Sequence, residues 1–278
     1  MPIRDLLLQL SSYPEPTPRW ALDAAASVAE LFDARLSGAL CHVHIPKISN
    51  YLADKLVKAN EAIAAENAKS NRNAKNLLAG FVSVVGSERM GDEILIECGS
   101  MVTPRELAAR ARAYDLAILP KYGQPETGFI AEGLVFDSGR PVLLLPPRGG
   151  AGHRFDAVVI GWDGSRTAAR ALADALPICA RAGTVELVTI TGEKALEAGA
   201  SLSDMRRHLS THGIDARTTE VPAQGLDAGS ALLRHCQRAG ADLLVMGAYG
   251  HSRFREFVLG GATRSVLADA ALPVLLSH

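Results

Sequence analysis

The sequence predicts an α/β protein built from two doubly wound domains, each a mainly parallel sheet of five strands flanked by helices. Two observations predict this fold class. Short apolar runs alternate with Ala-rich helical segments along the 278 residues, and the same strand signals recur in both halves of the chain. Alternation of strands and helices favours parallel sheets with right-handed crossovers.

The repeat is visible in short matching segments. Residues 114–122 read YDLAILPKY and residues 241–249 read ADLLVMGAY, and a glycine follows each segment. Residues 140–145 (RPVLLL) and 272–276 (LPVLL) are Pro-led apolar strands near the end of each half. Recurrence of several segments in the same order indicates duplicated domains.

A linker separates the two halves. Residues 146–153 read PPRGGAGH, and the prolines and glycines in this segment disfavour both helix and central strand. We therefore expect a first domain over residues 1–147 and a second domain over residues 153–278.

In the second half, continuous apolar or β-branched runs predict strands and Ala/Leu-rich runs predict helices. The predicted strands cover 157–161, 184–191, 243–247 and 273–276, and the predicted helices cover 166–181, 227–238 and 262–270.

The first half begins with a predicted strand at 5–10 and carries a long predicted helix over about 51–78, with Leu52, Leu56 and Ile63 on one face. The second half has no room for an equivalent of that helix. The segment from Thr103 to Glu106 reads as a capping box that starts the penultimate helix of the first half.

Composition limits the classes of function. The formal net charge of −1 provides no general attraction to nucleic acid or to an anionic membrane. No apolar stretch reaches the roughly 18 residues that span a bilayer, and the first residues lack the form of a signal peptide. The cysteines are widely spaced, which indicates reduced, buried thiols and a cytoplasmic location. They are Cys41, Cys98, Cys179 and Cys236.

The most informative segment is 246–265, MGAYGHSRFREFVLGGATRS, which follows a predicted strand and opens a predicted helix. Two residues separate Gly247 from Gly250, nine residues follow, and Gly260 and Gly261 then precede the helix. Glycines let the backbone approach an anion, and free N–H groups at a helix start point toward it. The alternative is that these glycines serve only a tight turn and a helix start.

This spacing resembles the ATP-binding signature of universal stress proteins, which is Gly, two residues, Gly, nine residues, Gly, then Ser or Thr. The segments VVIGWDGSRTAARAL (158–172), ADLLVMG (241–247) and LPVLL resemble other parts of the family's domain. The resemblance covers essentially all of 154–278 and, more weakly, 3–147. It implies a Rossmann-like fold in each domain and a bound adenine nucleotide, ATP or possibly ADP or AMP, with Mg²⁺.

The resemblance also implies the residues of the nucleotide site. Trp162 and Asp163 match the adenine and nucleoside side of the pocket, and Ile190 matches the strand end that contacts adenine. Met246 and Gly247 match the strand end beneath the ribose. The remaining matches lie in or near the phosphate-binding part, and they are Gly250, His251, Gly260, Gly261, Ala262 and Thr263.

The chain departs from the signature at Gly261, where the family has Ser or Thr. The lost hydroxyl removes a hydrogen bond to a charged phosphate worth about 1.5–3 kcal/mol, or roughly ten- to a hundredfold in affinity. Thr263, Ser252 or Arg264 could compensate. The expectation is weakened ATP binding, with ADP or AMP bound comparably.

The first half departs further. No glycine pair precedes a helix after Tyr122-Gly123, and the loop and helix that follow are together about five residues shorter than in the second half. The first strand leads into SSYPEPTP, without the Asp-Gly-Ser turn of the second half. We expect that the first half has lost phosphate binding and is structural or regulatory.

Several candidate residues could instead have a purely structural role. Asp163 can cap a helix as well as contact a ligand, and Trp162 can stack on adenine or pack against the sheet. His42 and His44 share one face of a predicted strand, but a metal site needs further ligands. No metal site and no catalytic residue is predicted.

Three functions remain open. The first is a stress-response protein whose nucleotide binding orders the 248–260 loop and regulates interactions with an unidentified protein partner. The others are an interaction module without nucleotide and a slow ATPase. By resemblance to tandem members, the two domains form an intramolecular pseudo-dimer with the last strand of each near the interface, and association into a homodimer stays open.

Overall fold

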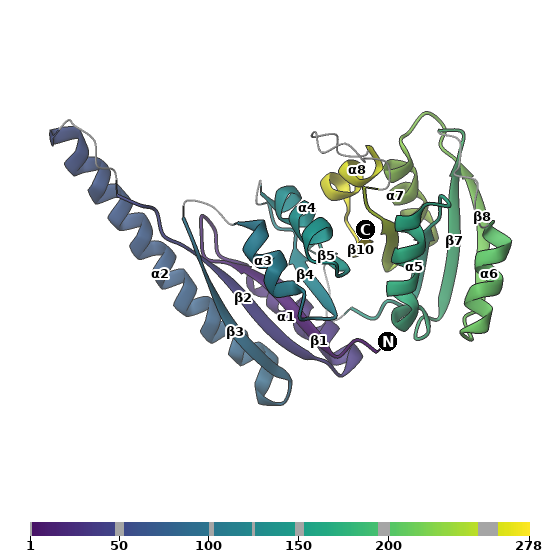
Figure 1. Ribbon diagram of the computed structural model, residues 1–278, viewed down its shortest axis with the longest axis horizontal. Coiled ribbons are helices and arrows are strands. Elements are labelled where there is room, and N and C mark those ends of the chain that lie inside the picture. The colour runs from purple at the N-terminus through teal and green to yellow at the C-terminus, as the bar shows by residue number, and fades with distance from the viewer. Residues whose placement is uncertain are drawn as a thin grey trace.

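The computed structural model describes a single ten-stranded sheet with helices on both faces (Figure 1). The described residues are 2–47, 53–99, 103–123, 126–147, 153–193, 201–249 and 261–278. The first half contains β1 (Asp5–Ser11), α1 (Arg19–Phe32), β2 (Arg35–Val43), α2 (Ala53–Arg89), β3 (Met90–Cys98), α3 (Pro104–Ala111), β4 (Leu116–Pro120), α4 (Thr127–Asp137) and β5 (Val142–Leu145). The second half contains β6 (Ala157–Gly161), α5 (Arg166–Cys179), β7 (Thr184–Thr191), α6 (Leu202–Thr211), β8 (Ala216–Pro222), α7 (Ala228–Ala239), β9 (Leu243–Gly247), α8 (Gly261–Asp269) and β10 (Val274–Ser277).

The strand order shows the duplication directly. It runs β3-β2-β1-β4-β5-β10-β9-β6-β7-β8, so the two halves repeat one order in opposite directions. Among the strands of the described residues, those within each half are parallel, and only β5 and β10 pair antiparallel, with Leu143 opposite Leu275. The α/β fold predicted from the alternating pattern is therefore confirmed, and the last strands of the two halves do meet.

Each face of the sheet has its own apolar core, and each core runs through both halves. Helices α1, α2, α5 and α6 contribute to one core, and α3, α4, α7 and α8 contribute to the other. Strands buried on both faces read as continuous apolar runs, which is why VLLL at 142–145 and AVVIG at 157–161 gave clear strand signals.

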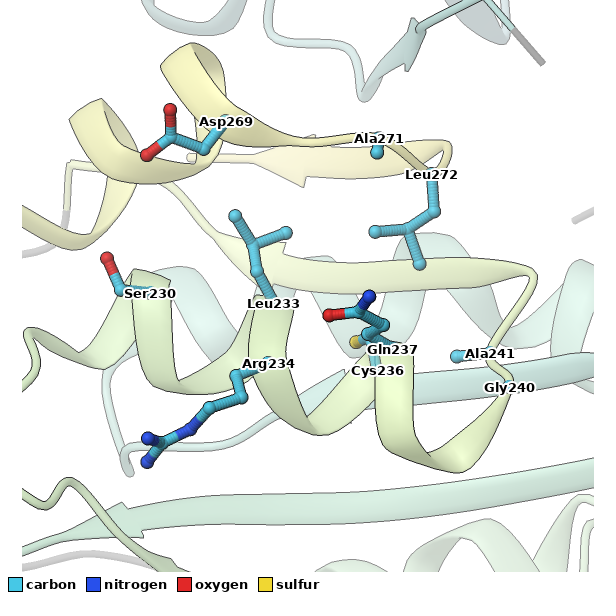
Figure 2. A pocket seen from close by; sticks show the side chains of 10 residues that line it. All are labelled: Ser230, Leu233, Arg234, Cys236, Gln237, Gly240, Ala241, Asp269, Ala271 and Leu272. Carbon is cyan, nitrogen blue, oxygen red and sulfur yellow. The ribbon is translucent and has the colours of Figure 1, made fainter.

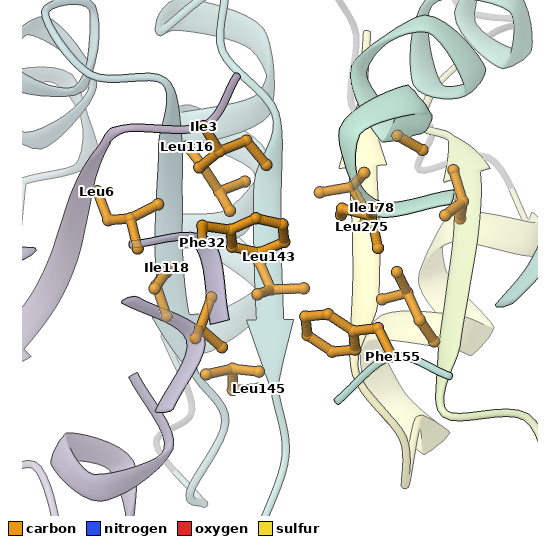
Figure 3. Packing of buried hydrophobic residues seen from close by; sticks show 14 of the residues in the cluster. Ile3, Leu6, Phe32, Leu116, Ile118, Leu143, Leu145, Phe155, Ile178 and Leu275 are labelled. Atoms are coloured by element: carbon orange, nitrogen blue, oxygen red, sulfur yellow. The ribbon is translucent and has the colours of Figure 1, made fainter. Parts of the chain in front are cut away.

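Apolar side chains close the seam between the halves. Leu143 and Leu145 of β5 face the same core as Leu275 of β10, and Phe155 and Ile178 pack beside them (Figure 3). Phe155 is 1% exposed. Full burial of such a side chain contributes about 1.5–3 kcal/mol, so the seam is a continuation of the cores rather than a surface contact between two domains.

Local capping residues set several helix boundaries. The Ser165 hydroxyl accepts a hydrogen bond from Ala168 N–H and begins α5. Asp227 accepts from Gly229 and Ser230 N–H and begins α7, which ends at Gly240 in the left-handed conformation (φ 65°). Asp and Ser favour helix starts because their oxygens accept these bonds, and Gly favours such ends because it lacks a Cβ.

The structure corrects one sequence expectation and adds detail to two others. The second half has no helix as long as α2, as expected, but a shorter helix, α6, stands in the same place with 10 residues, and β8 follows it. A capping box, Ser201 with Asp204, begins α6. Thr103 precedes α3 with an extended backbone, but its side chain makes no capping bond, so the predicted capping box does not form there.

The element bounds also locate the shortening predicted for the first half. Helix α4 has 11 residues and α8 has 9, so the helix of the first half is the longer one. All of the shortening therefore lies in the connection from β4 to α4. Within the described parts of the chain, no helix is long and apolar enough to cross a membrane. The four cysteines are buried and form no disulfide, as expected.

Candidate functional site

The predicted site lies at the carboxyl ends of β6 and β9. These strands are neighbours, but the chain leaves β6 through α5 toward β7 and leaves β9 through α8 toward β10, on opposite faces of the sheet. A point where successive connections diverge in this way forms a crevice at the strand ends, where ligands of open α/β sheets bind.

The turn after β6 presents Asp163. Its Oδ1 accepts a hydrogen bond of 3.0 Å from Ser165 N–H, and Gly164 between them has a left-handed φ of 82°. Asp163 is exposed at the strand end. Ser165, and not Asp163, caps the start of α5. The Asp163 carboxylate stabilises the turn through its bond to Ser165 N–H, and the side chain is exposed to solvent.

Trp162 is held firmly in the sheet. Its N–H donates to Val188 O (2.8 Å), and its carbonyl accepts from the Thr189 hydroxyl (2.8 Å). The side chain is 6% exposed and belongs to an apolar core. Of the two alternatives for Trp162, the geometry favours packing over stacking on a ligand, because the indole ring points into the protein.

Gly247 is required by packing. A Cβ on Gly247 would lie 2.5 Å from the backbone N of Ala168, at the first turn of α5. Real Cβ atoms do not approach backbone so closely, so α5 can begin against the end of β9 only because residue 247 is glycine. The nearby strand-end residues Ile190 and Met246 are buried, with exposed fractions of 8% and 5%.

The start of α8 contrasts with Gly247. A Cβ on Gly261 would meet no atom of the described residues within 4 Å, so none of these residues packs against the first residue of the helix. Ala262 packs close to Gly229 of α7. Thr263 is 3% exposed, and its hydroxyl oxygen accepts from Tyr249 N–H (3.3 Å). The Thr263 hydroxyl therefore faces inward, where it does not replace the hydroxyl missing at position 261.

Three predicted residues, Gly250, His251 and Gly260, lie outside the described residues. The structure thus brings the other predicted residues to one edge of one half-sheet. It also places there a residue that sequence reasoning missed, Tyr249. Tyr249 has a left-handed φ of 59° and is 4% exposed. Its only sequence signal was the Tyr-Gly doublet shared by the two halves.

The corresponding crevice in the first half, between β1 and β4, is filled by the protein itself. Ser11 N–H donates to the Thr17 hydroxyl (2.8 Å), and Thr17 N–H donates to Ser11 O (3.0 Å), which closes the turn after β1. The Thr17 hydroxyl also bonds the Tyr122 hydroxyl (3.1 Å). Thr17 is 3% exposed and Ser11 is fully buried.

Helix α2 covers the same edge of the first half. Asn67 bonds both N–H and O of Ile45, at 2.8 and 2.9 Å, and Asn73 donates to Ser12 O (3.0 Å). The Ser70 hydroxyl donates to Val43 O (2.8 Å) and lies 2.8 Å from the Ser12 hydroxyl. Backbone groups at these strand ends therefore bond to side chains of the same chain.

Other polar clusters and cavities have separate settings. His42 Nδ1 lies 3.1 Å from Glu97, and its Nε2 lies 2.7 Å from Asn71 Oδ1. The part of the chain that the structure describes holds no group of three residues able to bind a metal ion. A groove of about 520 Å³ runs beside α7 and the end of α8 (Figure 2). It contains none of the predicted site residues and lies near Gly240, at the amino end of β9.

Comparison with known proteins identifies the domain that carries the site. The model of the universal stress protein family matches residues 154–278. The second half of the chain belongs to the universal stress protein family. A universal stress protein of Synechocystis is 29% identical over 213 residues, which cover 73% of this chain and 68% of that protein.

Solved structures extend the likeness to the fold of the whole chain. A universal stress protein from Archaeoglobus fulgidus superposes with a TM-score of 0.70 over 98% of this chain and 95% of its own, at 16% identity. A putative universal stress protein from Pseudomonas aeruginosa has a TM-score of 0.54 over 99% and 93%, also at 16% identity. At these identities the likeness concerns the fold.

Proposed function

We propose that the second half of this universal stress protein binds an adenine nucleotide at the carboxyl ends of β6 and β9. The ligand is ATP, or ADP or AMP, with Mg²⁺ carried by the phosphates. Binding makes the protein a nucleotide-dependent regulator of interactions with another protein in the cytoplasm.

The observation that supports this proposal most is the open start of α8 at the crevice between β6 and β9. No atom of the described residues lies within 4 Å of a Cβ placed on Gly261, and the first N–H groups of a helix have no partner within the helix. These groups and the positive end of the helix dipole suit a phosphate. The exposed Asp163 carboxylate, at the end of the neighbouring strand, suits a ribose hydroxyl.

The first half supplies an internal contrast. Its equivalent crevice is closed by buried hydrogen bonds among Ser11, Thr17 and Tyr122 and by side chains of α2. A ligand there would have to break these bonds and leave buried polar groups unpaired, at about 1–3 kcal/mol for each group. We therefore propose one nucleotide site for each chain.

Calorimetric titration of MgATP, ADP and AMP into nucleotide-free protein tests the proposal, with one site per chain as the expected result. The variant Gly261→Asp places a negative charge where the phosphate is proposed to bind, and its Cβ meets no atom of the described residues within 4 Å. We expect it to weaken binding by at least about tenfold, through repulsion and loss of the helix-start site.

Gly128→Asp is the matched control. Gly128 is the second residue of α4, also has no atom within 4 Å of an added Cβ, and lies in the first half. Binding should be unchanged in this variant. If the folded wild-type protein binds none of the three nucleotides at millimolar concentration, the proposed function is wrong and an interaction module without nucleotide replaces it.

A further inference from the structure

An aromatic cluster joins the first half to the proposed nucleotide site. The ring centroid of Phe136, in α4, lies 4.5 Å from that of Tyr249, and the two ring planes make an angle of 39°. The Phe136 centroid also lies 4.6 Å from that of the His278 ring, with an interplanar angle of 64°. Phe136 belongs to the first half, whereas Tyr249 and His278 follow β9 and β10 of the second. Such ring pairs contribute to packing across an interface beyond the area that they bury.

The two residues whose rings Phe136 contacts also take part in hydrogen bonds at the backbone directly after β9. His278 Nδ1 donates to Ala248 O (3.0 Å), and Ala248 N–H donates to Ser277 O (2.8 Å). Tyr249 N–H donates to the hydroxyl of Thr263 in α8 (3.3 Å). This set of bonds ties the end of β9 to both β10 and the first turn of α8, the elements that flank the proposed site.

Tyr249 needs this support because of its backbone. A left-handed φ of 59° in a residue with a side chain is unfavourable, and such a conformation persists only when its surroundings impose it. The ring is buried, and no described residue bonds the buried Tyr249 hydroxyl. The contact of the ring with Phe136 is one of the contacts that surround Tyr249 in this conformation.

The first half also contacts the far end of α8. Lys121, which follows β4, donates from Nζ to the carbonyls of Ala268 and Ala270, the latter at 3.3 Å. A cation that bonds the last carbonyls of a helix stabilises the helix through its dipole. The first half thus contacts both the segment entering the site and the helix leaving it, and α4 packs beside α8 (Figure 1).

We propose that the first half is a built-in positioning partner for the nucleotide site of the second half. Phe136 acts through Tyr249 and His278 to hold the end of β9 in its binding conformation, so nucleotide affinity depends on a side chain of the other half. The predicted effect of Phe136 on nucleotide affinity rests on the proposed function. The predicted effect of Phe136 on the backbone at 248–249 does not depend on nucleotide binding.

The test compares Phe136→Ala with Phe136→Tyr and with Phe129→Ala in the full chain. Phe136 is 37% exposed, so the Tyr variant keeps the ring and can direct its hydroxyl to solvent. Phe129 lies on the same helix and is 54% exposed, which makes Phe129→Ala a control for losing an aromatic side chain from α4.

Amide hydrogen exchange is the first readout, because it needs no nucleotide. In Phe136→Ala, we expect the Ala248 and Tyr249 amides to exchange at least about tenfold faster, while amides of β6 and β7 keep their protection. Phe136→Tyr should restore slow exchange, and Phe129→Ala should leave it unchanged. Unchanged exchange at 248–249, or equal acceleration throughout the chain, would overturn the inference.

Nucleotide affinity is the second readout. If the wild-type protein binds AMP or ATP, Phe136→Ala should weaken binding about three- to tenfold, with recovery in Phe136→Tyr. Unchanged affinity would also overturn the inference. Failure of the wild-type protein to bind any nucleotide contradicts the proposed function instead, and the exchange experiment then decides on the positioning role alone.

Discussion

Single residues at the proposed site differ in what they can tolerate, although several are glycines. Gly247 has no room for a Cβ, because the first turn of α5 lies against it, whereas a Cβ on Gly261 would meet no atom of the described residues within 4 Å. The two positions belong to one sequence signature, in which Gly247 matches the strand end beneath the ribose and Gly261 the phosphate-binding part. Packing separates them, since the first keeps a helix close to a strand and the second leaves a helix start accessible.

Gly261→Ser should strengthen nucleotide binding. The substitution restores the hydroxyl that the family signature carries, and the added Cβ meets no atom of the described residues within 4 Å. A hydrogen bond to a charged phosphate contributes about 1.5–3 kcal/mol, so affinity for ATP should rise roughly tenfold or more. Calorimetry checks this, with Gly261→Ala as the control that adds a Cβ but no hydroxyl. Equal affinities for the two variants would show that this hydroxyl does not contact the ligand.

Gly247→Ala should destabilise the protein whether or not nucleotide is present. The added Cβ would lie 2.5 Å from the backbone of α5, and overpacking of this kind costs about 1–3 kcal/mol. Urea unfolding should show a lower midpoint for Gly247→Ala than for Gly261→Ala. Wild-type stability in Gly247→Ala would mean that α5 shifts without cost.

At the scale of elements, helix starts carry much of the local specification of the fold. Ser165, Ser201 and Asp227 each bond backbone N–H groups in the first turn of their helices. Burial by itself raises the pKa of Asp227, but hydrogen bonds from Ser230, Ser265 and the backbone outweigh it and lower the pKa below the ordinary value of 3.8. The carboxylate form is therefore the form that the folded helix stabilises.

Asp227→Ala should lower the free energy of unfolding by about 1–2 kcal/mol near neutral pH, as for other lost helix caps. A lowered pKa in the folded state means that this contribution is present above about pH 4 and disappears as the pH falls below it. Urea unfolding at pH 7 and pH 3 checks the difference. The control is Asp215→Ala, whose side chain is 96% exposed and whose ion pair should contribute little. A loss of the same size at both pH values would contradict the capping account.

At the scale of the whole molecule, the antiparallel pairing of β5 with β10 turns two half-sheets into one. The outer edges, β3 and β8, carry exposed charged residues, which discourage pairing with other chains. They include Asp92 and Glu93 on β3 and Arg217 and Glu220 on β8. The inner edge strands, β5 and β10, are instead apolar, and each covers the other by pairing with it.

A fragment of residues 153–278 should therefore self-associate. Without β5, strand β10 becomes an open edge with Val274, Leu275 and Leu276 uncovered, and a second copy can replace the missing strand by the same antiparallel pairing. Sedimentation should show a dimer for the fragment and a monomer for the full chain at the same concentration. Leu275→Lys in the fragment should reduce dimerisation, and a stable monomeric fragment would contradict this account.

The sequence by itself determined the kinds of element, their order and the duplication. Strands at 157–161, 184–191 and 243–247 agree with the structure residue for residue. These features are encoded locally, because apolar runs, turn residues and caps act over a few positions. The short helix α6 and the edge strand β8 were not predicted. Strand β8 consists mostly of polar residues and has few buried side chains, so its sequence lacks an apolar run.

Only the tertiary structure decided which of two similar crevices is open. The first is filled by contacts such as Thr17 with Tyr122 and Ser12 with Ser70, which join residues far apart in the chain. The inward turn of Trp162 and the contact of Phe136 with Tyr249 are of the same kind. Each depends on which elements the folded sheet brings together, and no local pattern records that. The physical reason is that packing, unlike periodicity, is a property of neighbours in space.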